Sequence, residues 1–257
     1  MSSDPLLVLS GVHKRFEMAG GPLTALSGID LTVARGETLV LVGESGCGKS
    51  TLLRLMAGLE KPSEGRVLFD GRLVTGPALE RGMVFQEPRL FPWMTVEGNV
   101  AFGLPEGADP GGKVDEIVGW TGLKGFEKAY PSQLSGGMRQ RAALARTLVS
   151  RPRLLLMDEP FGALDALTRI RMQEETLRLK EREKATLVLV THDIDEAVFL
   201  GDRVVVLSPR PGRVKRVFSV PLSHPRDRNG AALVRIRARI YDEFFRKPSR
   251  PRRRSRT

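Results

Sequence analysis

Apolar residues along this chain gather in short runs that alternate with segments of helical spacing. Runs rich in Val and Leu and bounded by glycine or polar residues predict buried strands. These strands are predicted over 6–9, 38–42, 66–69, 83–85, 154–157, 186–190, 203–207 and 214–220. Helices are predicted over 50–57, 115–120, 137–149, 166–183 and 231–245. Because strands and helices alternate, we expect an α/β fold with a largely parallel sheet.

Residues 87–150 interrupt this alternation. They contain no strand-like run, and in the segment 137–149 the residues Met138, Ala142 and Ala145 recur at helical spacing. We therefore expect an α-helical block inserted into the α/β body.

Composition narrows the class of protein. The chain has 257 residues, of which 41% are hydrophobic and 28% charged, so wholesale disorder is excluded. No apolar run approaches the roughly 20 residues that span a bilayer, and no basic region precedes the first apolar run, so we expect no signal peptide. The single cysteine, Cys47, excludes a disulfide framework and fits a reducing compartment.

The net charge of +11 is unevenly distributed. Residues 1–208 hold 25 Lys and Arg against 27 Asp and Glu, whereas residues 209–257 hold 16 against 3. Because residues 1–208 are nearly neutral, we do not expect this part of the chain to bind nucleic acid. Three interpretations of the basic end stay open: a solvated tail, contact with anionic lipid headgroups, or contact with nucleic acid. Residues 246–257 carry seven basic residues and no acid, so we expect them to be disordered.

A glycine-rich loop follows the predicted strand 38–42. Gly43–Ser50 fits the pattern G-x-x-x-x-G-K-[ST] and precedes a predicted helix. In such a loop the backbone N–H groups and the helix N-terminus face a phosphate. Lys49 would reach the β- and γ-phosphates, and the Ser50 hydroxyl would bind Mg²⁺. The alternative is an ordinary glycine-rich turn.

Two acidic residues follow the predicted strand 154–157. Asp158 and Glu159 therefore lie at the carboxyl end of a buried strand, where open α/β sheets bind ligands. Asp158 suits coordination of Mg²⁺, and Glu159 suits a general base that polarises a water molecule. The alternative is a pair of solvated acids in a loop.

A second candidate anion site begins the predicted helix 137–149. Ser135, Gly136 and Gly137 cap its N-terminus. Two phosphate-binding helix starts in one chain are explained if two chains meet head to tail and each completes the nucleotide site of the other. The alternative is an ordinary capped helix.

These motifs, in this order and spacing, resemble those of the ATP-binding cassette (ABC) ATPases over residues 6 to about 220. The resemblance implies a P-loop NTPase-type, mostly parallel α/β core, an N-terminal antiparallel β portion and an inserted α-helical subdomain. It implies an ABC ATPase domain over 1–220, with the helical subdomain at about 87–150. A helical extension over 221–245 and the basic tail 246–257 would follow.

The resemblance also implies residue roles. Gln86 looks like the Q-loop glutamine, His192 like the switch histidine that contacts the γ-phosphate, and Phe16 like the aromatic that stacks on adenine. The implied catalytic residues are Glu159, His192, Lys49 and Gln86. The implied ATP-binding residues are Phe16, Gly43, Glu44, Ser45, Gly46, Cys47, Gly48, Lys49, Ser50, Thr51, Ser135, Gly136 and Gly137. The implied Mg²⁺ ligands are Ser50, Gln86 and Asp158.

Three positions depart from the usual family pattern. Phe16 replaces a tyrosine and keeps its stacking face. Met138 stands where glutamine is most often found, and we expect little functional cost. Cys47 is either a small filler or, at a helix N-terminus, a group whose thiolate is favoured. If it is reactive, alkylation should block ATP binding and prior ATP should protect it.

Four other residues lack such context. We expect His13 and His224 to be surface residues, and Trp93 and Trp120 to be packing residues.

Three functional classes share this kind of ATPase: transporter subunits, chromosome or DNA-repair ATPases, and translation factors. Only 84 residues separate Ser50 from Ser135, with no heptad run, which argues against the long coiled coil of the second class. The chain has one cassette, whereas the third class usually has two.

Residues 86–104 resemble the importer segment that contacts the coupling helix of a permease. Their apolar cluster, Leu90, Phe91, Trp93 and Met94, is either core or a partner-binding site.

The resemblance is greatest to importers of the nitrate/sulfonate/taurine type, through 134–138, 91–93 and 220–228. It implies a separate membrane permease, a periplasmic or lipid-anchored solute-binding protein, and a second copy of this chain or a paralogous ATPase subunit. It implies a peripheral position at the cytoplasmic face of the inner membrane. The alternatives are import of another small solute, or a non-transport ABC ATPase that acts on nucleic acid or ribosomes.

Overall fold

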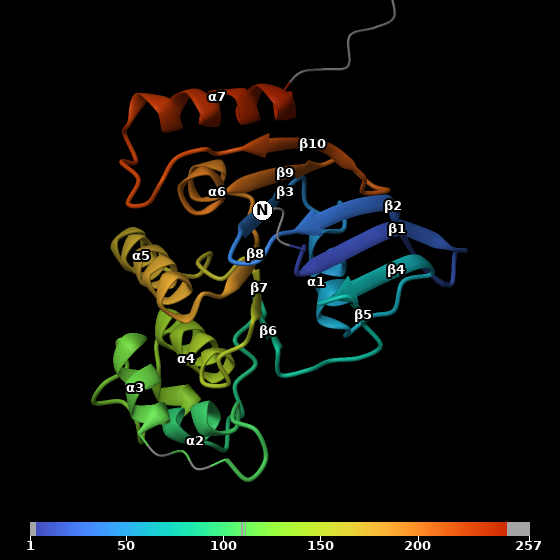
Figure 1. Ribbon diagram of the computed structural model, residues 1–257. Helices are drawn as coiled ribbons and strands as arrows, with labels where there is room; N and C mark the ends of the chain where they lie inside the picture. The colour runs from blue at the N-terminus through green and yellow to red at the C-terminus, as the bar shows by residue number, and fades with distance from the viewer. Residues whose placement is uncertain (1–3, 109, 111, 246–257) are drawn as a thin grey trace, which may run out of the picture.

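The computed structural model describes residues 4–108, 110 and 112–245. A six-stranded sheet forms its centre, in the order β10-β9-β3-β8-β7-β6 (Figure 1). Strands β9, β3, β8, β7 and β6 run parallel, and β10 is antiparallel to β9. The bounds are β3 Thr38–Val42, β6 Arg81–Val84, β7 Leu154–Asp158, β8 Thr186–Val190, β9 Arg203–Leu207 and β10 Val214–Ser219. The carboxyl ends of the five parallel strands therefore share one edge.

An antiparallel sheet of four strands lies beside this core, in the order β2-β1-β4-β5. Its strands are β1 Leu7–Phe16, β2 Leu23–Val33, β4 Glu64–Phe69 and β5 Arg72–Leu73. A single bridge, between Leu26 and Gly212, links β2 to the loop that joins β9 to β10. The glycine-rich loop is thereby packed against the antiparallel sheet as well as the parallel one.

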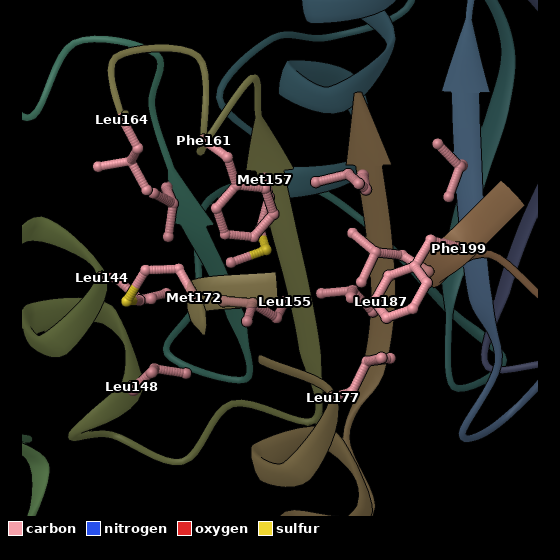
Figure 2. Packing of buried hydrophobic residues seen from close by; sticks show 14 of the residues in the cluster. Leu144, Leu148, Leu155, Met157, Phe161, Leu164, Met172, Leu177, Leu187 and Phe199 are labelled. Carbon is pink, nitrogen blue, oxygen red and sulfur yellow. The ribbon is translucent and has the colours of Figure 1, made fainter. Parts of the chain in front are cut away.

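The two faces of the central sheet are covered by different elements. Leu39 and Leu41 of β3 join the cluster that contains α1 (Lys49–Ala57) and the antiparallel sheet. Val40 and Val42, which point the other way, join the cluster that contains the remaining helices. Figure 2 shows this second cluster around Leu155 and Met157. Strand residues that are buried on both faces explain the continuous apolar runs of the sequence.

The helices of residues 96–148 lie below the sheet in Figure 1, and the last helix of the chain lies above β10. Residues 96–148 form α2 Val96–Ala101, α3 Lys113–Trp120, a short 3₁₀ helix Pro131–Gln133 and α4 Gly136–Leu148. The later helices are α5 Ala166–Glu183, α6 Ile194–Leu200 and α7 Ala231–Phe245. None of the helices in the described part of the chain is both long and apolar enough to cross a membrane.

The expected fold class is confirmed: a mostly parallel α/β core, an antiparallel β portion and an inserted block of helices. Several elements differ from the prediction. The strand expected at 6–9 extends to Phe16, and β2, α2 and α6 were not predicted. The predicted tail 246–257 lies outside the described residues, and the domain boundaries stay predictions.

Candidate nucleotide-binding site

The glycine-rich loop runs from the end of β3 into α1. Gly48 caps α1 in a left-handed conformation with φ of 104°, and no side chain bonds to the first turn. A Cβ at Gly48 would lie 2.7 Å from Leu26 Cδ2. Glycine is therefore favoured at this position by the left-handed backbone conformation and by the lack of space for a side chain. The first N–H groups of α1 are therefore left for a ligand, which is the arrangement that binds anions.

The Lys49 ammonium lies inside this loop. Its side chain is buried, and Nζ donates to the carbonyl oxygens of Gly43 at 2.8 Å and Glu44 at 3.0 Å. Within the described ranges no carboxylate lies within ion-pair distance of Nζ. A buried ammonium whose acceptors are backbone carbonyls is suited to an anionic ligand, because such a ligand supplies the missing negative charge.

Ser50 and Asp158 meet where α1 begins and β7 ends. The Ser50 hydroxyl donates to Asp158 Oδ1 at 3.0 Å. Burial raises the pKa of Asp158, while the Ser50 hydrogen bond and the charges of Arg54 and Lys49 oppose that shift. A carboxylate and a hydroxyl are hard oxygen donors, so this pair fits a Mg²⁺ ion that is shared with phosphate oxygens.

Glu159 and His192 follow neighbouring parallel strands, β7 and β8. His192 Nδ1 lies 3.2 Å from Glu159 Oε2. Glu159 has φ of 46°, the left-handed region that is uncommon for residues with a Cβ, and its N–H donates to Val190 O at 3.0 Å. Both side chains line a cavity of about 60 Å³. Backbone strain at a charged residue beside a cavity is a frequent feature of catalytic sites.

Gln86 lies at the same edge of the sheet, and Phe16 lies at the end of β1. The register of β6 and β7 pairs Val84 with Met157, so exposed Gln86 emerges at the sheet edge that carries Glu159. Phe16 ends β1 and is half-buried, with Lys14 Nζ 4.8 Å from its ring centroid. The position of Gln86 agrees with a role beside a nucleotide, and the roles of both residues stay predictions.

Ser135 lies on a different face of the molecule. Its hydroxyl accepts the Met138 N–H at 3.2 Å as the cap of α4, and Ser135 and Gly136 are exposed. Helix α4 packs in the cluster on the second face of the sheet, whereas α1 packs on the first. One chain therefore does not bring Ser135 to its own glycine-rich loop.

Two contacts to the site could not be read from the sequence. The Arg210 guanidinium, in the loop after β9, donates from Nε and Nη2 to the Gly46 carbonyl at 3.1 and 3.0 Å. Gln140 of α4 donates to Phe85 O at 3.2 Å, beside Gln86. Partners this far apart in sequence carry no local pattern that marks them.

Cys47 corrects an expectation. Its side chain is 1% exposed, and burial raises the pKa of its thiol although Lys49 opposes the shift. The expectation of a favoured thiolate is therefore wrong. The thiol fills the space beside Gly43, where a Cβ would lie 2.7 Å from Cys47 Sγ, so the filler interpretation holds.

Three further expectations have mixed outcomes. His224 is half-buried near Phe199, and burial lowers its pKa, so the surface assignment is wrong. Trp93 is 69% exposed and is not a packing residue. Trp120 does pack against the core, with Arg182 4.0 Å from its ring centroid, as expected.

Phe91, Trp93 and Phe102 form an aromatic patch before and after α2. The ring centroid of Phe91 lies 5.5 Å from that of Trp93 and 4.6 Å from that of Phe102, and Phe102 is 60% exposed. The buried side chain of Asn99 fixes the loop beneath, since its amide exchanges hydrogen bonds with the Phe91 N–H and carbonyl. A rigid, exposed aromatic surface is typical of a partner-binding site.

Comparisons with known proteins identify the family of the chain. Residues 26–162 match the family described as ABC transporter. The chain is 48% identical over 240 residues to the aliphatic sulfonates import ATP-binding protein SsuB of Bacillus subtilis, which covers 93% of this chain and 94% of the relative. It is 50% identical over 238 residues to the uncharacterized ABC transporter ATP-binding protein MJ0412 of Methanocaldococcus jannaschii, covering 91% and 89%.

A solved structure gives the same result. The dimeric post-hydrolysis state of the ATP-binding cassette MJ0796, bound to ADP and Pi, matches with a TM-score of 0.77 and 32% identity, over 84% of this chain and all of the other. The family match, the relatives and the solved structure agree, and the chain belongs to the ABC transporter ATP-binding proteins, a family of ATPases.

Proposed function

We propose that this chain is the ATP-hydrolysing subunit of an ABC importer of the nitrate/sulfonate/taurine type, with an organosulfonate or a small anion as the solute. Its residues 1–220 form the ATPase domain, 221–245 a helical extension and 246–257 a basic tail. The observation that carries the proposal is the pairing of a buried Lys49 loop with Ser50–Asp158 and Glu159–His192. Relatives named as sulfonate importers support the solute class.

Two copies act together in this proposal. Lys49 and the N-terminus of α1 hold the phosphates of ATP in one copy, and Ser135–Gly137 of the other copy close over the γ-phosphate. Phe16 stacks on the adenine. Ser135 lies on the opposite face of the sheet from α1, which supports this arrangement. The exposed N-terminus of α4 is then left to face a second chain.

Hydrolysis needs a polarised water. Glu159 accepts a proton from the attacking water, and His192, 3.2 Å away, orients that carboxylate and the γ-phosphate. Ser50, Asp158 and Gln86 would hold Mg²⁺, which neutralises charge on the phosphates when bound. Lys49 adds a second positive charge on the same groups.

The permease is a separate polypeptide in this proposal, and the aromatic patch of Phe91, Trp93 and Phe102 is its contact. The 69% exposure of Trp93 supports this assignment. The chain would then lie peripherally at the cytoplasmic face of the membrane, with a solute-binding protein on the other side. The basic tail would face anionic headgroups.

The first test is affinity purification of the full chain from gently solubilised native cells, with mass spectrometry of the proteins that co-purify. A multi-span permease is expected, and Trp93→Ala should release it, whereas the control variant Leu73→Ala, at an exposed apolar position on β5, should not. Recovery of ribosomal proteins or DNA-repair factors in place of a permease would contradict the importer assignment.

The solute is tested on the assembled complex. ATP turnover in vesicles should rise when a binding protein loaded with an alkanesulfonate is added. Stimulation by nitrate but not by a sulfonate would change the solute class and leave the ATPase assignment intact.

A further inference from the structure

The segment after β10 folds back onto helix α6, which begins two residues after His192. Arg226 is the centre of this contact, and its side chain is 1% exposed. Its guanidinium donates to the carbonyl oxygens of Val198 at 2.9 Å and Gly201 at 2.7 Å, at the end of α6. A cation that binds the last carbonyls of a helix fixes that end of the helix.

Arg228 begins a chain of hydrogen bonds toward the start of α6. Arg228 Nη2 donates to Gln173 Oε1 at 2.7 Å, and Gln173 Nε2 donates to Glu196 Oε1 at 2.8 Å. Gln173 is 2% exposed and Glu196 is 5% exposed. The Arg228 guanidinium also lies 3.5 Å from the ring centroid of Phe199 on α6. Three segments distant in sequence are thus joined by one polar path.

The path ends on both neighbours of His192. Burial raises the pKa of the Glu196 carboxyl, and the neighbouring Thr191 hydroxyl opposes that shift, so the two side chains face each other. The same Thr191 oxygen accepts the Asp193 N–H at 3.0 Å, and Asp193 Oδ1 accepts the Glu196 N–H at 3.2 Å. The His192 side chain is 70% exposed, so its position depends mainly on the backbone that these bonds fix.

The direction of each bond gives Arg228 a specific part. A glutamine amide has one accepting and one donating end, and Arg228 holds the accepting end of Gln173. The donating end must then face Glu196, whose buried carboxyl needs a donor. Without Arg228 the accepting end of Gln173 loses this donor, and the amide that holds the Glu196 carboxyl can shift and move that carboxyl with it. Glu196 lines the same cavity as Glu159 and His192, so the displacement reaches the site.

We propose that Arg228, acting through Gln173 and Glu196, is a positioning residue that holds His192 in place for ATP hydrolysis. The extension that follows the cassette is then a brace on the switch histidine rather than an appendage. This inference rests on the role of His192 in the proposed function. Arg228 itself touches neither nucleotide nor water in this account.

The test uses steady-state ATP hydrolysis and nucleotide binding by the full-length chain. Arg228→Ala should lower kcat about tenfold, as expected when a catalytic group is misplaced by about an ångström or less. The Kd for ATP should stay within about twofold, because the glycine-rich loop is untouched. Arg228→Lys keeps one donor for Gln173 and should recover part of the activity. Arg216→Ala is the control, since Arg216, on β10, pairs with Glu243 of the extension and makes no bond to α6 that the structure records.

A double-mutant cycle separates positioning from general stability. In a His192→Ala background, Arg228→Ala should cause no further loss of kcat. The positioning role of Arg228 would be overturned if Arg228→Ala lowered kcat equally in both backgrounds. It would also be overturned if Arg216→Ala lowered kcat as much as Arg228→Ala, or if kcat were unchanged in Arg228→Ala. An unchanged kcat in His192→Ala alone would instead overturn the role of His192, and with it the inference, whatever Arg228→Ala does.

Discussion

Two helices of this chain, α1 and α4, start with glycine-rich sequences that suit a phosphate, and they are built differently. The start of α1 is enclosed: Lys49 is buried, Asp158 is buried and bonded to Ser50, and no side chain occupies the first-turn N–H groups. The start of α4 is open: Ser135 is exposed and its own hydroxyl takes the Met138 N–H.

This difference indicates that the two helix N-termini have different roles in nucleotide binding. In the proposed function, the α1 site supplies the cation and the Mg²⁺ donors and holds a nucleotide within one chain. The α4 site has a helix N-terminus but lies on the other face of the sheet. In the proposed function it acts on a nucleotide from a second chain, so affinity should depend on α1 and catalysis on both.

Removing the buried cation should have the largest effect. Lys49→Ala takes away the charge that offsets the β- and γ-phosphates, so we expect ATP affinity to fall about 100-fold or more and hydrolysis to be lost. Fluorescence titration with a labelled nucleotide measures this. Lys124→Ala, at an exposed position away from the loop, should bind normally. Normal binding by Lys49→Ala would refute the assignment of the α1 site.

Removing the base should affect turnover but not binding. Glu159→Gln keeps the shape and loses the proton acceptor, so kcat should fall about 100-fold or more while the Kd for ATP changes little. Phosphate release measures kcat, with exposed Glu174→Gln as control. A loss of binding in parallel with kcat would show that Glu159 holds the nucleotide instead.

Blocking the open helix start should separate the two sites. Ser135→Arg fills the start of α4 with a bulky side chain, so kcat should fall roughly tenfold to 100-fold. Nucleotide binding by the dilute chain should be unchanged, because α1 is complete by itself. If Ser135→Arg weakens binding by the dilute chain as strongly as Lys49→Ala does, the division between the two helix starts is wrong.

The smallest effect concerns the stability of the enclosed site. Burial raises the pKa of Asp158 in the folded chain above its ordinary value of 3.8, so its charged form costs stability above the raised pKa. Protonation relieves that cost as pH falls through the raised pKa. Asp158→Asn should therefore melt a few degrees higher than the parent near neutral pH, with a difference that shrinks as the pH is lowered. Calorimetry without nucleotide measures it, and a difference that grows on acidification would contradict the account.

The accuracy of the sequence predictions followed the range of the interactions. Strands β3 and β8 and helix α5 are local patterns, and the predicted bounds match. Helix α6, with seven residues, is too short to establish a period. It is stabilised by packing of its buried residues in the core and by Asp193 and Arg226 at its two ends. Strand β2 was missed because Gly28 and alternating polar residues weaken its apolar run.

The candidate site shows the same division. The residues of the loop 43–50 are consecutive in the sequence, and so are Asp158 and Glu159. Their chemistry can therefore be predicted from local sequence patterns. The contacts of Arg210 with Gly46 and of Arg228 with Gln173 join residues 164 and 55 positions apart, and only the fold brings them together. The buried state of Cys47, which reversed the expected shift in its pKa, likewise depends on packing that no local pattern encodes.

The most direct test of the account is the mass of Glu159→Gln in solution, measured by light scattering with and without Mg-ATP. Slow hydrolysis should preserve the closed state, so the 28.4 kDa chain should double its mass only when Mg-ATP is present. The double variant Glu159→Gln, Ser135→Arg should remain a single chain in Mg-ATP and should still bind ATP. A Glu159→Gln protein that binds Mg-ATP and stays monomeric would contradict the claim that two chains complete each site.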